Sequence, residues 1–182
     1  MFLHIRTYLD DKTGFLNRVN QFLAIAANHG HKTLFVLFDD CWKGDYASGK
    51  QPDPVPGLHN SQWVQCPGNI KYTDDEYKSY VQDVLSLFRN DARVVMWDLY
   101  NEVGNSGHLN NSYPLMSKIF GWAREINLTQ PITSGHWNSE AAYSSINQFI
   151  LSNSDVNTFH AYCDEICTEA AIKNIQSKPH LI

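Results

Sequence analysis

The segment at residues 93–105 constrains the fold most, because an apolar run leads directly into an Asn-Glu pair and a Gly/Asn turn. Its Val, Met, Trp and Leu side chains are typical of a strand buried on both faces, as in a parallel sheet covered by helices. Such folds place catalytic and ligand-binding groups at the carboxyl ends of their strands. We therefore expect chemistry around Glu102, with a solvated turn residue as the competing interpretation.

The composition limits the classes of function. The chain has 182 residues, of which 43% are hydrophobic, and is typical of one globular domain. Its formal net charge of -5 and the absence of a basic stripe argue against a nucleic-acid partner. No apolar run approaches the roughly 20 residues of a membrane span, and residues 1–6 lack the features of a signal peptide.

The cysteines leave the cellular compartment open. The chain has four, too few for a dense disulfide scaffold, and their spacing matches no paired Cys-x-x-Cys zinc site. An extracytoplasmic or secreted parent protein is compatible with this pattern.

Strands and helices are expected to alternate along the chain. The predicted strands lie at residues 2–5, 33–38, 94–99, 132–137, 156–162 and 179–182. The predicted helices lie at residues 15–30, 73–88, 112–126, 139–150 and 164–175. Strict alternation predicts parallel strands joined by right-handed crossovers.

Two α/β architectures fit this alternation, an open doubly wound sheet and a closed barrel. No Gly-rich phosphate loop follows the first predicted strand, which argues against a nucleotide-binding open sheet. Polar and aromatic side chains follow successive strands, which favours a (β/α)8 TIM barrel. Because a complete barrel takes about 250 residues, we expect a partial barrel, roughly strands 2 to 7, as a single partial domain over residues 1–182.

Three stretches resemble one family of enzymes. Residues 97–102, Trp-Asp-Leu-Tyr-Asn-Glu, resemble the W-D-x-x-N-E signature that ends the fourth strand of clan-A retaining glycoside hydrolases of the cellulase and mannanase type. Residues 35–42 resemble the third strand of that family, and His160-Ala161-Tyr162 resembles the His-x-Tyr that ends the sixth. The family usually has Pro after the Glu, where this chain has Val103.

The resemblance implies hydrolysis of a β-linked poly- or oligosaccharide by double displacement. This mechanism uses two carboxyl groups about 5 Å apart, one as acid/base and one as nucleophile. The resemblance gives Glu102 the acid/base role, for which we expect a pKa raised toward the working pH. It places the nucleophilic Glu beyond Ile182, so we expect residues 1–182 alone to show no turnover and marginal stability. No cofactor is expected.

The resemblance also implies contacts with the sugar. Asn101 would bond the hydroxyl next to the reacting carbon, Tyr162 would donate to the nucleophile, and His160 would bond the substrate or orient a carboxylate. A Gly/Pro/Asn-rich loop at residues 43–71 is expected to form one wall of the cleft. Further candidates for stacking on or bonding to sugar are Trp42, Trp63, Trp137, Asp39, Asp40, His59 and His136. The competing role of each is packing or turn structure.

Two other classes of function are kept as alternatives. A non-catalytic carbohydrate-binding barrel would need the tryptophans but not the carboxylates. A metal-dependent barrel hydrolase would use His136, His160, Cys163 and Asp40, but their spacing matches no known ligand pattern, so we expect no metal. The oligomeric state is left open.

Overall fold

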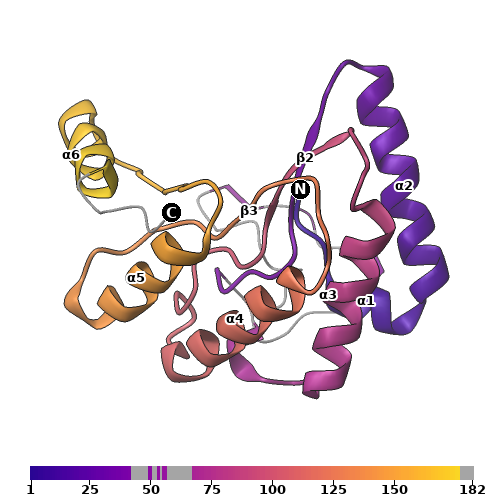
Figure 1. Ribbon diagram of the computed structural model, residues 1–182, viewed down its shortest axis with the longest axis horizontal. Coiled ribbons are helices and arrows are strands. Elements are labelled where there is room, and N and C mark those ends of the chain that lie inside the picture. Colours follow the sequence, from indigo (N-terminus) through magenta and orange to yellow (C-terminus); the bar gives the residue numbers. More distant parts are fainter. Residues whose placement is uncertain (42–48, 51–52, 54, 57–66, 177–182) are drawn as a thin grey trace.

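The computed structural model describes residues 1–41, 49–50, 53, 55–56 and 67–176 (Figure 1). Trp42, His59, Trp63, most of the predicted cleft loop and the predicted strand at 179–182 lie outside the described residues. The described helices are α1 (Ile5–Asp10), α2 (Lys12–Asn28), α3 (Asp74–Phe88), α4 (Leu109–Arg124), α5 (Ser144–Asn153) and α6 (Glu165–Gln176), with short 3-10 turns η1 (Pro67–Asn69) and η2 (Ala141–Tyr143). The described strands are β1 (Thr33–Val36), β2 (Val94–Asp98) and β3 (Ile132–Thr133).

The strands form one parallel sheet in the order β1-β2-β3. Phe35 pairs with Trp97, and Trp97 pairs with Ile132. Single parallel bridges, Phe2 to Val36 and His136 to Phe159, add one short contact at each edge.

The predicted partial TIM barrel is wrong. The described residues are mixed α/β, but they contain a sheet of only three strands and are mostly helical. The predicted strands at residues 2–5 and 156–162 are reduced to the single bridges at Phe2 and Phe159. Residues 5–10 instead form α1, because the His4 side chain accepts a hydrogen bond from the Arg6 N–H and caps the helix.

The prediction that β2 is buried on both faces is also wrong. Val95 is 48% exposed, although Val94 and Trp97 are buried. The register explains this, because Thr33 pairs with Val94 while the next residue of β1, Leu34, pairs with Met96. Val95 is therefore the extra residue of a β-bulge and has no partner in the ladder.

The helices predicted from periodicity and capping are confirmed in position. The clearest is α3, where the Glu76 N–H donates to Thr73 Oγ1 over 3.3 Å and the Thr73 N–H donates to Glu76 Oε2 over 2.7 Å. This capping box satisfies backbone donors that a helix start leaves without partners. α4 begins at Leu109, before the predicted start at Ser112.

One hydrophobic core joins the sheet to α1–α5. Trp97 of β2 is fully buried and stacks on Phe35 of β1 with ring centroids 5.4 Å apart. Tyr80 of α3 packs edge-on against Phe38, which follows β1. These contacts fix β1 and β2 side by side, so the residues that follow the two strands emerge next to each other. No helix in the described part of the chain is long and apolar enough to cross a lipid bilayer.

Candidate functional site

The residues that follow β1 and β2 meet at one edge of the sheet. Asp39 and Asn101 form a parallel bridge, the Asn101 N–H donates to the Phe38 carbonyl over 2.8 Å, and the Asp40 N–H donates to the Asn101 carbonyl over 3.1 Å. The site therefore begins where the strand pairing ends, as expected for groups at the carboxyl ends of parallel strands.

Glu102 lies at the centre of this site. It is 6% exposed and has a φ of 47°, in the left-handed region that side chains other than Gly rarely adopt. Its Oε1 lies 2.6 Å from His160 Nδ1, and its Oε2 accepts a hydrogen bond of 2.6 Å from Asn105 Nδ2. A strained backbone at a buried, hydrogen-bonded carboxylate is a common feature of functional sites.

The pKa of Glu102 differs from the expectation. Burial by itself would raise the pKa, but hydrogen bonds from His160, Cys41 and Asn105 outweigh burial and lower it from 4.5 to about 2. The expectation of a raised pKa rested on burial or a nearby carboxylate, whereas the hydrogen-bond donors around Glu102 decide the direction here. Glu102 in this arrangement is an ionised acceptor at neutral pH.

His160 is brought to Glu102 by the segment after β3. Its backbone N–H donates to the His136 carbonyl over 2.8 Å. The ring passes close to Gly135, where an added Cβ would lie only 2.8 Å from His160 Nε2. The hydrogen bond to Glu102 raises the pKa of His160 above its ordinary 6.5, against the opposing effect of burial. His160 and Glu102 thus form a coupled pair in which the proton sits on the imidazole.

Hydrogen bonds from three parts of the chain hold the turn at residues 102–105. Asp40 Oδ2 accepts from the Gly104 N–H over 2.7 Å. Trp137 Nε1 donates to the Val103 carbonyl over 3.0 Å, and the Tyr143 hydroxyl donates to the Gly104 carbonyl over 3.3 Å. The turn that carries Glu102 is therefore organised before any ligand arrives.

This places two predicted sugar-binding residues in supporting positions. Asp40 also accepts from the Tyr100 hydroxyl over 2.8 Å and from the Gly68 N–H over 3.2 Å. Trp137 packs edge-on against Tyr143, with ring centroids 5.1 Å apart. Contact of Asp40 and Trp137 with sugar stays a prediction.

Asn101 and Asp39 form a buried pair beside Glu102. Asn101 Nδ2 and the Cys41 N–H both donate to Asp39 Oδ1, over 2.8 Å and 2.9 Å. Burial raises the pKa of Asp39 to about 6, with Glu102 as a further raising charge. The amide of Asn101 here orients Asp39, and its hydrogen bond to a sugar hydroxyl stays a prediction.

A hollow of about 430 Å³ opens beside His160. Its lining residues come from the segment after β3, the segment before α6, and α6 itself: His136, Trp137, Ser139, His160, Ala161, Tyr162, Cys163, Cys167, Ala170 and Ala171. Four predicted substrate-binding residues, His136, Trp137, His160 and Tyr162, therefore line one hollow. The Tyr162 side chain is 93% exposed at its edge. The volume lies within the range of small-molecule sites.

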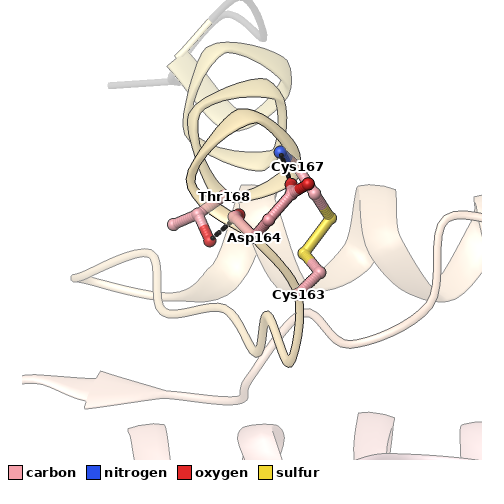
Figure 2. Close-up of a disulfide and its surroundings, with 4 residues drawn as sticks. All are labelled: Cys163, Asp164, Cys167 and Thr168. Atoms are coloured by element: carbon pink, nitrogen blue, oxygen red, sulfur yellow. Dashed lines mark hydrogen bonds between the residues drawn. A yellow bond between two sulfur atoms is a disulfide. The ribbon is translucent and has the colours of Figure 1, made fainter.

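A disulfide between Cys163 and Cys167 forms part of this wall (Figure 2). It spans the start of α6, where Asp164 Oδ1 accepts from the Cys167 N–H over 2.9 Å and the Thr168 hydroxyl donates to the Asp164 carbonyl over 3.0 Å. Figure 1 shows α6 set apart from the sheet at the yellow end of the chain. The bond therefore ties Cys163, which precedes α6, to the first turn of the helix.

Reduction of this disulfide is expected to loosen the wall of the hollow at a small cost in stability. The closed loop is short, so the loss in free energy of unfolding should be at most about 2 kcal/mol. We expect a dithiol reductant to shift the amide NMR signals of residues 160–171 and to lower Tm. A Cys163→Ser/Cys167→Ser variant should already show both changes and not respond to reductant. Identical spectra with and without reductant would contradict this role.

Asn105, Cys41 and the disulfide are not among the site features predicted from the sequence. Cys41 is a buried cysteine after β1 that is not part of a disulfide, and its Sγ lies 3.6 Å from Asn105 Nδ2. The Cys-x-x-x-Cys spacing at a predicted helix start was the available signal for the disulfide, because residues four apart face each other across one helical turn.

The described residues offer no support for a metal site. They contain no group of three or more His, Cys, Asp and Glu side chains arranged to hold an ion. Cys163, one of the four candidate ligands, is joined to Cys167 instead.

The comparisons with known proteins give no family. No protein-family model matches this sequence, and no curated protein matches it.

Proposed function

We propose that the site around Glu102 hydrolyses a β-linked poly- or oligosaccharide by a retaining mechanism. The observation that carries the proposal is the contact of 2.6 Å between buried Glu102 and His160, a residue that lines the hollow together with aromatic side chains. A carboxyl group that reaches the hollow through His160, with Trp137 and Tyr162 in the wall, supports the two needs of a glycosidase, proton transfer and ring recognition.

In the proposed reaction Glu102 acts as the acid/base. It protonates the leaving oxygen and later removes a proton from the attacking water. The proton lies on His160, 2.6 Å away, and can move to Glu102 when a negative charge raises the pKa of the carboxyl group. The nucleophilic carboxylate that the resemblance places after Ile182 would supply this charge. Tyr162 would donate to that carboxylate, and Asn101 would bond the substrate.

A non-catalytic sugar-binding site is the second candidate. The pKa of about 2 for Glu102 favours it, because a permanently ionised carboxylate accepts hydrogen bonds from sugar hydroxyls but does not protonate a leaving group. Both candidates require sugar in the same hollow.

Binding of sugar to this hollow is tested by NMR titration with β-1,4-linked gluco- and manno-oligosaccharides. We expect shifts of the Trp137 indole N–H and the His160 ring signals. Tyr162→Ala should weaken binding about 2- to 10-fold, the value of one aromatic contact, and should not affect folding because the side chain is exposed.

Ile166→Ala is the matched control, because Ile166 is 78% exposed, lies on α6, and does not line the hollow. It should leave binding unchanged. No shift at millimolar oligosaccharide would overturn both candidate functions.

A further inference from the structure

The turn after β2 places an amide directly on the Glu102 carboxylate. Asn105 Nδ2 lies 2.6 Å from Glu102 Oε2, on the opposite oxygen from the one that contacts His160. The same nitrogen lies 3.6 Å from Cys41 Sγ, so one amide bridges the carboxylate and the buried thiol. Each oxygen of Glu102 thus has its own nitrogen donor.

The position of Asn105 follows from the backbone of the turn. The Asn105 N–H donates to the Glu102 carbonyl over 3.0 Å, which closes the turn. Gly104 has a φ of 84°, and an added Cβ there would lie 2.4 Å from Leu109 Cδ1. The left-handed backbone at Glu102 and the tight fit at Gly104 direct the Asn105 side chain back over the carboxylate.

We propose that Asn105 is a positioning residue for Glu102: its amide fixes Oε2, so that Oε1 faces His160 and the carboxylate stays ionised until a ligand enters. The catalytic part of this role rests on the proposed function. A neutral donor stabilises the charged form of a carboxylate and not the protonated form. Asn105 therefore lowers the pH at which Glu102 takes up its proton, together with His160 and Cys41.

Among the described residues, the titratable groups that face Glu102 from other elements are His160, Cys41 and the carboxylate of Asp39. His160 and Cys41 favour the ionised form of Glu102, and Asp39 is a like charge when it is ionised. Asn105 differs from all three because it carries no charge and does not titrate. Its removal changes one donor and leaves every titrating neighbour in place.

The test is a carbon-13 NMR titration of the Glu102 carboxyl group in the 182-residue chain, with the signal assigned from its loss in Glu102→Gln. Asn105→Ala should raise the pKa of Glu102 by about 1, the value of one hydrogen bond to a charged group. Asn105→Asp, which keeps the size but adds a like charge, should raise it further. Asn110→Asp adds the same charge on the exposed surface of α4 and should leave the pKa unchanged.

An unchanged pKa of Glu102 in both Asn105 variants would overturn the proposal. If Asn105→Ala does not fold, Asn105→Asp, which is isosteric, still decides the outcome. Because this titration needs no substrate, a failure of oligosaccharide binding would remove the proposed function and leave the link between Asn105 and Glu102 standing. If the hydrolase is active, Asn105→Ala should also move the Glu102 limb of its kcat/KM pH profile to higher pH.

Discussion

Glu102→Gln is expected to lower the turnover of β-glycosides by about 10²- to 10⁴-fold, the usual value of general acid–base catalysis. The amide of Gln cannot donate a proton to the leaving oxygen, but it fills the same buried space and can still bond the substrate. The loss should therefore fall on kcat and not on binding. The measurement is hydrolysis of aryl β-glycosides by a protein that contains both carboxylates.

A comparison of substrates with two kinds of leaving group tests the acid role of Glu102 more directly. An aryl group with a low phenol pKa leaves without protonation, so Glu102→Gln should slow formation of the glycosyl intermediate less for that substrate than for an unactivated disaccharide. Glu140→Gln, at an exposed carboxylate, should leave both rates unchanged. Unchanged hydrolysis in Glu102→Gln would show that Glu102 is not the acid/base.

The same substitution has a second readout in the 182-residue chain. The hydrogen bond and charge of Glu102 are the main cause of the raised pKa of His160. In Glu102→Gln the imidazole keeps only the more distant charges of Asp98 and Asp39, so its pKa should fall toward or below 6.5. A histidine ring titration by NMR measures this directly.

Asp98→Asn is expected to remove much of the pH dependence of folding stability. Asp98 is buried at the end of β2, and burial raises its pKa from 3.8 to about 7. A carboxyl group with a raised folded-state pKa contributes stability that is full below its unfolded pKa and is lost as the pH rises through the folded value. The wild-type chain should therefore lose stability between about pH 4 and pH 8, by an amount on the order of 4 kcal/mol from this group.

Asp39 and His160 also have raised pKa values, so their contributions to folding stability also fall as the pH rises. A smaller decrease of stability with pH should therefore remain in Asp98→Asn. Glu102, with a pKa lowered to about 2, loses its contribution only below about pH 4.5 and lies outside this window. The side-chain oxygen of Asn can still accept from the Tyr100 N–H, which donates to Asp98 Oδ1 over 3.0 Å.

Urea unfolding at pH 5 and pH 8.5 measures the difference. Asp75→Asn, at an exposed carboxylate, is the control and should follow the wild type. Parallel pH profiles for wild type and Asp98→Asn would contradict the prediction.

The helices could be predicted from the sequence because their signals are local. In α3 the capping box at Thr73 and the periodic apolar residues both lie within the helix itself. The strands depend on distant partners. The residue types at 94–99 favour a strand. The bulge at Val95 arises from the register with β1, and no feature of the sequence indicates it. The barrel prediction assumed that each segment with a strand-like pattern pairs with its neighbours. The described residues do not make these pairings.

The same contrast between local signals and contacts of distant residues applies to the site. Of the residues predicted after strands, Glu102 and His160 lie in contact, and Asn101 forms a bridge with Asp39. The sequence pattern did not indicate these contacts. Asn105 reaches Glu102 across a turn whose backbone is left-handed at Glu102, and Trp137 supports the turn through an indole N–H that no spacing rule predicts.

The geometry of the turn at residues 102–105 depends on residues outside the turn. Its backbone is held by Asp40, which follows β1, and by Trp137 and Tyr143, which lie between β3 and α5. A short peptide spanning β2 and the turn would lack all three anchors, so grafting it onto another scaffold would not reproduce the geometry. Relatives of this site are better recognised by the spatial arrangement of these anchors than by the Asn-Glu dipeptide.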